Sequence, residues 1–429
     1  MKVQLDYGKY GLWIDVPDNN LVKILKMKKS SPIINPTEDM KKALEAPIGS
    51  PPLANLAQKK KSACIVICDI TRPVPNEIIL RPILSTLLEN GMKQENITIL
   101  IATGIHRPNM DDELIYLVGE EIASNYRIVN HFAKKKESHT YLGKTSTGTD
   151  VFVDSNYVNA DLKITTGFIE SHLMAGFSGG RKLICPGISS LDTVKVMHGP
   201  KILEHPNARE GVIEGNPFHE ESLEIAKMAG MDFIVNVALD EKRQITGIFV
   251  GDMEKAHEQG VAFVRDHVGD TVAEPVDIVV TTSAGFPLDA TFYQSIKGLT
   301  AALPVVKEGD TIILAAECQE GLGSPEFSQL VRETTDIDLF MQNIYRDDYF
   351  VVDQWQLEEL AKVLRKVDVY LFSEGISRQD KDKMLTTAID SVEEGIEMAL
   401  NRHGDDATIA VIPKGPYILA DVGCKLKQR

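Results

Sequence analysis

The sequence contains no long apolar segment. No window of its 429 residues holds 18 consecutive apolar side chains, which is about the minimum for a transmembrane helix. The first residues, Met1 to Asp6, also lack the apolar run of a secretory signal peptide. We therefore expect a chain that is neither secreted nor held in a membrane.

Cysteine is scarce. The chain has five cysteines, an odd number, and none of their spacings matches a zinc site. This pattern excludes a dense disulfide framework and is typical of the reducing cytoplasm, where we expect the protein to act. The cysteines are Cys64, Cys68, Cys185, Cys318 and Cys424.

The chain has fewer basic than acidic residues. Lys and Arg number 46 and Asp and Glu number 62, which gives a formal net charge of −16. Nucleic-acid binding needs a basic face that neutralises phosphates, so we expect no nucleic-acid partner. A small anionic substrate is compatible with this charge only if its site carries local cations.

The apolar runs that are present alternate with amphipathic segments, which is typical of α/β proteins with mostly parallel sheets. The predicted strands are Ala63–Asp69, Ile97–Thr103, Asp161–Thr166, Phe233–Leu239, Asp277–Thr282, Thr311–Ala316, Val367–Phe372 and Thr408–Ile412. The predicted helices are Asn76–Asn90, Asp111–Ser124, His219–Ala229, Met253–Val268, Thr291–Ala302, Gln354–Lys366 and Val392–Arg402.

A polar segment at residues 269–275 contains glycine and proline and follows a predicted helix. Such segments mark domain boundaries. We predict two α/β domains, residues 1–270 and 271–429, with the active site in the cleft between them.

Polar residues follow four of the predicted strands, at residues 69–73, 103–108, 167–172 and 281–287. In open α/β sheets the ligand crevice lies outside the carboxyl ends of the strands. We therefore expect these four segments to meet at one site.

The segment from Gly176 to Lys182 is rich in glycine and ends in Arg181 and Lys182. Glycine lets backbone N–H groups approach a phosphate closely, and the two cations add charge. The P-loop pattern is absent, since Arg181 stands where that pattern requires glycine. The segment is either a cradle for an anion or nucleotide, or a turn that precedes a surface lysine.

His106, His172 and His198 lie near glycines and predicted loops, which suggests acid–base catalysis or metal binding. Five other histidines stand in polar or helix-surface contexts and receive no role: His131, His139, His257, His267 and His403.

Two cations are candidates for binding a carboxylate. Arg72 offers a bidentate guanidinium and Lys297 a point charge. Gln294 precedes Lys297 by three residues, so both share one face of the predicted helix.

The sequence resembles the nickel-dependent lactate racemases and their 2-hydroxyacid racemase and epimerase relatives over nearly its whole length. The motifs that carry the resemblance are Asp69-x-Thr71-Arg72-Pro73, Ala102-Thr103-Gly104-x-His106-Arg107-Pro108, Gly167 to His172, Ala175 to Lys182, His198, Tyr293-Gln294-x-x-Lys297-Gly298 and Asp353-Gln354-Trp355.

The resemblance implies a nickel pincer nucleotide, pyridinium-3,5-bisthiocarboxylic acid mononucleotide, joined covalently to Lys182. Nickel would be bound by a ring carbon, two sulfurs and His198, a set that suits Ni(II). The other residues implied at the cofactor are Asp69, Gly176, Ser178, Gly179 and Gly180. Proteins that make this cofactor would be partners for loading.

The reaction implied by the resemblance interconverts stereoisomers at C2 of a 2-hydroxyacid by hydride transfer. Lys182 is catalytic because it carries the cofactor, and His106 and His172 would act as acid and base, one for each enantiomer. The residues implied around the substrate are Arg72, Gln294, Lys297 and Trp355.

Three alternative functions were weighed against this one. The same chemistry could act on a larger substrate such as malate, an aryl-lactate or a sugar acid such as gluconate. A protein that binds the nickel cofactor without catalysis would not need the paired histidines. A nicotinamide-dependent dehydrogenase would need a Gly-x-Gly-x-x-Gly turn after a strand, and none follows the predicted strands.

Overall fold

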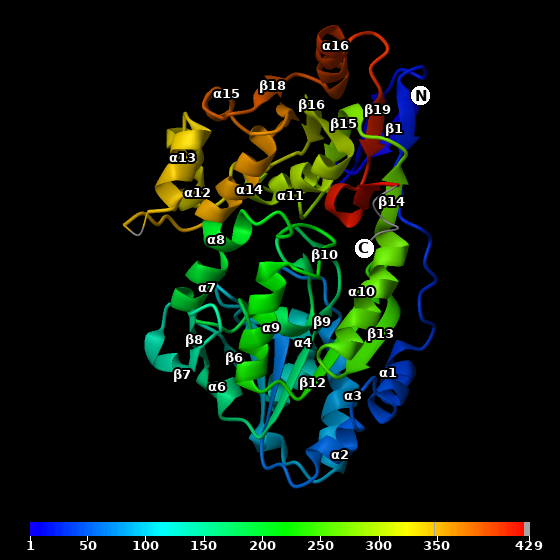
Figure 1. The fold of residues 1–429 in the computed structure, drawn as a ribbon. Coiled ribbons are helices and arrows are strands. Elements are labelled where there is room, and N and C mark those ends of the chain that lie inside the picture. Colours follow the sequence, from blue (N-terminus) through cyan, green and yellow to red (C-terminus); the bar gives the residue numbers. More distant parts are fainter. Residues whose placement is uncertain (347, 424–429) are drawn as a thin grey trace.

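The computed structural model describes residues 1–346 and 348–423 and consists of two α/β lobes. One lobe holds most of the first 270 residues and the other holds the rest, and a helix-lined junction separates them (Figure 1). Each lobe has a six-stranded sheet with its own buried core. The predicted class, α/β with mostly parallel sheets, is confirmed. Cys424 lies outside the described residues.

The sheet of the first lobe has the order β13-β12-β9-β4-β5-β6. Its strands pair in parallel except for the edge strand β13, which runs antiparallel to β12. The central strand β4 is buried at every residue, as its unbroken apolar sequence predicts. The bounds are β4 Ala63–Cys68, β5 Ile97–Ala102, β6 Arg127–Asn130, β9 Leu162–Phe168, β12 Phe233–Leu239 and β13 Ile245–Gly251.

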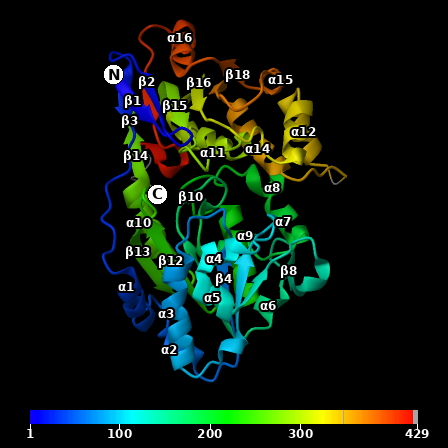
Figure 2. The ribbon, with the colours of Figure 1, turned by 180° about the vertical axis from the view of Figure 1, so that it is seen from behind.

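Helices cover both faces of this sheet. Figure 1 shows α9 and α10 on the near side, and the view from behind in Figure 2 shows α3, α4 and α5 on the other. Their bounds are α3 Asn76–Glu89, α4 Asp112–Val118, α5 Glu120–Asn125, α9 Pro217–Ala229 and α10 Lys255–Val268. The predicted helix 111–124 is thus two helices, because Gly119 takes a φ of +83° between them.

The sheet of the second lobe has the order β18-β17-β16-β15-β19-β3 and is parallel throughout. Its strands are β15 Val276–Thr282, β16 Val306–Ala315, β17 Asp368–Phe372, β18 Thr387–Ile389 and β19 Ile409–Ile412. Its site-bearing helices are α11 Phe292–Ala302 and α14 Gln354–Leu364, and α16 Val392–His403 follows β18.

The sixth strand of that sheet, β3 Leu21–Ile24, comes from the N-terminus. The hairpin of β1 Lys2–Leu5 and β2 Leu12–Asp15 packs into the same lobe, where Leu5 and Ile14 are buried. The chain then runs down the outside to α1 Pro36–Glu45 in the first lobe (Figure 1). A division at residue 270 alone therefore misplaces the first strands, since this pairing joins segments almost 400 residues apart.

All eight predicted strands are present, and seven of them begin and end within two residues of the prediction. The exception is β16, which starts at Val306, because the exposed residues 307–309 carry no apolar signal and separate Val306 from the buried run. The strands that the sequence did not predict include β1, β2, β3, β6 and β13. Among the described residues, no helix is long and apolar enough to span a membrane.

Candidate active site between the lobes

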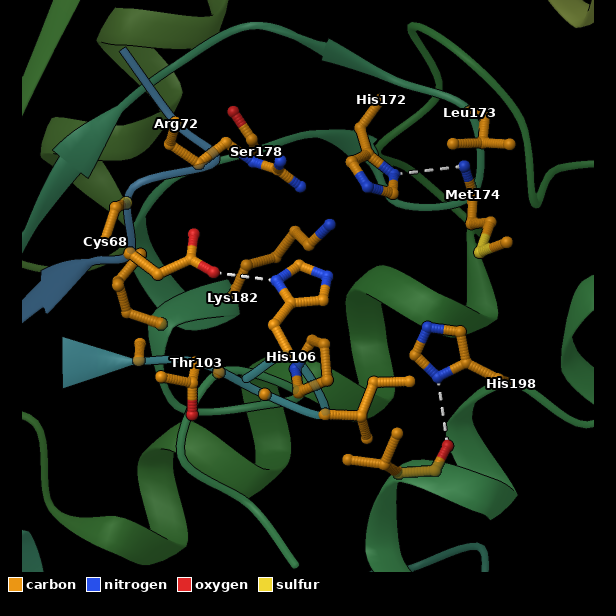
Figure 3. A pocket seen from close by; sticks show the side chains of 18 of the residues that line it. Cys68, Arg72, Thr103, His106, His172, Leu173, Met174, Ser178, Lys182 and His198 are labelled. Carbon is orange, nitrogen blue, oxygen red and sulfur yellow. Dashed lines mark hydrogen bonds and ion pairs between the residues drawn. The ribbon is translucent and has the colours of Figure 1, made fainter. Parts of the chain in front are cut away.

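A cavity of about 200 Å³ lies where the two lobes meet. The loops after β4, β5 and β9 line it from the first lobe, and α11 and α14 line it from the second. The fourth segment that was expected at this site, residues 281–287, does not line the cavity. It collects most of the candidate residues, several of which point toward its centre in Figure 3. The candidate residues that line the cavity are Asp69, Arg72, His106, His172, Ser178, Gly179, Lys182, His198, Gln294, Lys297 and Trp355.

His106 is held by Asp69. The Nδ1 atom of His106 lies 2.7 Å from Oδ2 of Asp69, and the Thr71 hydroxyl donates to the other carboxylate oxygen at 2.6 Å. Burial favours the neutral acid, but the hydrogen bonds from His106 and Thr71 and the Arg72 charge outweigh it, so the pKa of Asp69 is lowered. The structure thus gives Asp69 a contact with His106 that the sequence did not predict.

His172 is held differently. Its Nδ1 atom accepts hydrogen bonds from the backbone N–H groups of Met174, at 3.2 Å, and Ala175, at 3.3 Å. Burial, followed by the charges of Lys182 and Lys297, lowers its pKa well below the ordinary value. Both effects favour the neutral form of the ring.

Lys182 projects into the cavity from η3, Gly180–Leu183 (Figure 3). Burial and then the neighbouring Arg72 charge lower its pKa well below the ordinary value. Within the described part of the chain no carboxylate forms an ion pair with it, and its ammonium group lies 5.7 Å from the centre of the Phe218 ring. An amine whose pKa is lowered in this way has the property that a nucleophilic lysine needs.

Lys297 and Arg72 are the cations of the cavity that could bind an anion. Burial and the Arg72 charge lower the pKa of Lys297 to about 8, although Glu170 opposes the shift. The Arg72 guanidinium contacts only oxygens of Thr71 among the described residues. The cavity is therefore a local positive site in an acidic protein and suits an anionic ligand. Glu170, which tempers this charge, was quoted in the sequence motif but given no role.

His198 caps the C-terminal end of α7, Leu191–Met197. Its Nδ1 atom lies 3.0 Å from the Val194 carbonyl oxygen, which can only accept, so Nδ1 carries the proton and Nε2 keeps a lone pair. Burial lowers the pKa of His198 to about 4. Its ring lies 5.1 Å from the Trp355 ring of the second lobe and 5.3 Å from that of Phe218.

The second lobe contributes a hydrogen-bonded aromatic pair. The indole N–H of Trp355 donates to the Tyr293 hydroxyl at 3.1 Å, and both side chains line the cavity. Tyr293 received no role from the sequence, although it belongs to a quoted motif. The Oε1 atom of Gln294 is buried without a hydrogen-bond donor among the described residues. It offers an acceptor to a ligand.

The glycine-rich segment meets the cavity only in part. Gly176 and Gly180 are not lining residues. A Cβ at Gly176 would clash with the Val212 carbonyl oxygen, and Gly180 has a φ of +50°, a conformation that favours glycine. The N–H of Gly180 donates to Asn236 Oδ1 at 2.9 Å. Ser178 and Gly179 do line the cavity.

The prediction that Arg181 adds positive charge for a bound anion is wrong. Its guanidinium turns into the core, where it donates to the carbonyl oxygens of Ala175 and Phe177 and contacts His257 at 2.9 Å. His257 and His131 are themselves buried, so their predicted surface contexts are wrong. Their partners come from distant segments and leave no local signal in the sequence.

Comparison with known proteins places the chain in context. Residues 7–211 match the family model of the lactate racemase N-terminal domain, and residues 271–419 match that of the lactate racemase C-terminal domain. The chain is 37% identical to lactate racemase of Thermoanaerobacterium thermosaccharolyticum, over 97% of this chain and 98% of that protein. It is 36% identical to lactate racemase of Lactiplantibacillus plantarum, over 96% and 98% of the two chains.

Solved structures agree with the fold. The lactate racemase apoprotein of T. thermosaccharolyticum superposes with a TM-score of 0.92 at 36% identity and covers 98% of this chain and 100% of its own. A protein of Thermotoga maritima superposes with a TM-score of 0.68 at 18% identity, over 92% and 100% of the two chains. The second likeness concerns the fold alone.

Proposed function

The chain belongs to the lactate racemase family, and we propose that it interconverts the two C2 stereoisomers of a 2-hydroxyacid such as lactate. The observation that carries this proposal is the convergence of the imidazoles of His106 and His172 and the cations Arg72 and Lys297 on one interlobe cavity. Imidazoles move protons near neutral pH, and cations bind the substrate carboxylate. A protein that only bound a cofactor would not need His106 backed by Asp69.

The residues fit a tethered, metal-containing cofactor. Lys182 supplies a partly buried amine that could form a covalent bond, and the unprotonated Nε2 of His198 could bind a metal. No group of three or more His, Cys, Asp or Glu side chains in residues 1–346 and 348–423 is arranged to hold a metal ion. His198 would therefore share the metal with donors of the cofactor itself, as in a nickel pincer nucleotide joined to Lys182.

When bound, such a cofactor would supply a hydride acceptor for C2 of the substrate. The protein residues do the rest. Arg72 and Lys297 hold the carboxylate, and the free acceptor of Gln294 suits the substrate hydroxyl. His106 takes the hydroxyl proton at Nε2, because Asp69 keeps its other nitrogen protonated. Asp69, Ser178 and Gly179 line the wall that the nucleotide would contact.

The test is an isotope experiment on protein produced together with the cofactor-biosynthesis proteins. Lactate deuterated at C2 should racemise in ordinary water with its deuterium retained, and more slowly than unlabelled lactate. Unlabelled lactate in heavy water should gain almost no deuterium at C2. Loss of the label to solvent at the rate of racemisation would contradict hydride transfer and would make the histidines direct bases at C2.

The substrate is tested separately with the same loaded protein. Lactate, malate, an aryl-lactate and gluconate are compared by kcat/KM for change of configuration at C2. We expect lactate to be the best of the four. A loaded protein that changes the configuration of none of them would contradict the proposed racemase activity.

A further inference from the structure

The imidazole of His172 is held by the turn of a short hairpin. His172 lies on β10, Ser171–His172, which pairs with β11, Gly176–Phe177. In the turn between these strands, the N–H groups of Met174 and Ala175 donate to Nδ1 of His172 (Figure 3). The orientation of the ring therefore depends on the orientation of the peptide groups of the turn.

One of these peptide groups is held on its other side by a distant residue. A trans peptide group is planar, and its N–H and C=O point in opposite directions. The N–H that Ala175 donates to His172 belongs to the same trans peptide group as the carbonyl of Met174. That carbonyl oxygen accepts a hydrogen bond from Nδ2 of Asn216 at 2.9 Å. The residue that holds the Met174 oxygen thus also directs the Ala175 N–H toward the His172 ring.

Asn216 has a single possible orientation. It is 0% exposed and is the N-cap of α9, where its Oδ1 accepts from the N–H groups of Phe218, at 2.9 Å, and His219, at 3.2 Å. N–H groups only donate, so the amide oxygen must face the helix and Nδ2 must face away from it. Nδ2 donates to the carbonyl oxygens of Met174 and Val212, at 2.9 Å each. Each polar atom of this side chain is therefore fully used.

Two further contacts restrain the turn. Arg181 donates to the carbonyl oxygens of Ala175 and Phe177, at 2.9 and 3.1 Å. The segment that leads to Asn216 packs directly on the hairpin, since a Cβ at Gly176 would lie 2.0 Å from the Val212 carbonyl oxygen. A turn that is packed this closely keeps the peptide orientation that Asn216 selects.

We propose that Asn216 is a positioning residue for His172: its side-chain amide fixes the Met174–Ala175 peptide group, whose N–H in turn fixes the imidazole in the cavity. This inference rests on the proposed function, in which His106 and His172 move the hydroxyl proton of the substrate. Asn216 does not line the cavity, so it acts through His172. The two histidines are thus positioned by different means, because the Asp69 carboxylate holds His106.

The test has to separate this role from helix capping. Asn216→Asp and Asn216→Ser both keep an oxygen that caps α9, because Asp and Ser are good N-cap residues. Neither keeps the amide donor for Met174, since Asp has a carboxylate and the Ser side chain ends one bond earlier. Asn216→Ser introduces no buried charge and is therefore the second variant. The matched control is Ser391→Ala, which removes the N-cap of α16 in the other lobe.

The position of the ring is measured first on protein without its cofactor. The ¹H–¹⁵N spectra of chain labelled with ¹⁵N-histidine report the hydrogen bonding of each ring nitrogen, and His172→Gln and His106→Gln assign the two rings. We expect the Nδ1 signal of His172 to move in both Asn216 variants and to stay in Ser391→Ala. The signals of His106 should stay in all three. An unmoved His172 signal in both Asn216 variants would overturn the proposal.

The activity of the loaded variants is measured next, after intact mass has shown that each carries the cofactor. Asn216→Asp and Asn216→Ser should lower kcat by about 10²-fold, the cost of misplacing a catalytic group by about 1 Å. Their KM should hardly change, because the proton transfer is a contribution made in the transition state. Ser391→Ala should leave kcat and KM unchanged although it lowers the melting temperature.

The outcomes separate the two proposals. If the Asn216 variants lower kcat no more than Ser391→Ala does, the inference fails. If the loaded, unaltered protein racemises no 2-hydroxyacid, the proposed function fails, whereas the spectra still decide whether Asn216 positions His172.

Discussion

Lys182 and Lys297 are two partly buried lysines of one cavity, and the proposal gives a covalent bond to only one of them. Lys182→Ala should abolish covalent loading, because the amine that would join the cofactor is gone. Lys297→Ala should load normally and lose substrate affinity instead. The measurement is the intact mass of each variant after production with the cofactor-biosynthesis proteins.

Lys297→Ala is the matched control for that experiment, since it also removes a lysine whose pKa burial lowers. A cofactor mass retained on Lys182→Ala would move the attachment to another residue. Thermal unfolding of both variants guards against loss of fold, and we expect each to stay within about 1 kcal/mol of the unaltered protein, as for most substitutions outside the close-packed core.

At the scale of an element, helix α14 carries two acids on a buried face. Glu358 and Glu359 are 0% and 1% exposed, and α14 packs against α8, Pro200–Leu203, of the first lobe. Lys362 pairs with Glu359 at 2.7 Å, but both carboxylate oxygens of Glu358 are buried without a partner among the described residues. Burial and then the Glu359 charge raise the pKa of Glu358 to about 9.

This raised pKa predicts a loss of stability with rising pH. The folded protein keeps the Glu358 proton up to about pH 9, whereas the ordinary pKa of the group is 4.5. Between these values the unfolded chain binds fewer protons, so ionisation favours unfolding by up to about 1.4 kcal/mol per pH unit. Glu358→Gln should therefore unfold at a higher temperature than the unaltered protein at pH 8, and the gain should shrink toward pH 5.

The control for that prediction lies on α16, where Glu397 is exposed. Glu397→Gln should leave the pH dependence of thermal unfolding unchanged. Equal melting temperatures of Glu358→Gln and the unaltered protein at pH 8 would show that the Glu358 carboxyl finds a partner in solution.

At the scale of the whole molecule, the N-terminal segment completes the C-terminal lobe. Leu25 follows β3, is 0% exposed and belongs to the core of that lobe, and its N–H donates to the Val411 carbonyl at 2.9 Å. Leu25→Ala should lower the free energy of unfolding by about 2–5 kcal/mol, the range for a large-to-small core substitution. Denaturant unfolding measures the change.

Val22, three residues earlier in the same segment, is 53% exposed and provides the comparison. Val22→Ala should stay within about 0.5 kcal/mol of the unaltered protein, as surface substitutions usually do. If Leu25→Ala lowers the free energy of unfolding no more than Val22→Ala does, the first strands contribute nothing to the C-terminal core.

The sequence by itself determined the main strands, the site-bearing helices and the family. Strands such as β4 are unbroken apolar runs, and such runs are buried wherever the chain folds. The carboxyl ends of parallel strands meet at one edge of a sheet, so the motifs at Asp69, His106 and His172 could be expected at one site.

Only the tertiary structure decided the rest, since it depends on contacts between distant segments. Arg181 and Lys182 are neighbours in sequence, yet one turns into the core toward His257 and the other into the cavity. The place of β3 depends on β19, almost 400 residues away. The hydrogen-bonding partner of a histidine Nδ1 atom is also set by the fold. Nδ1 of His106 contacts the Asp69 carboxylate, whereas Nδ1 of His172 accepts a hydrogen bond from the Met174 N–H.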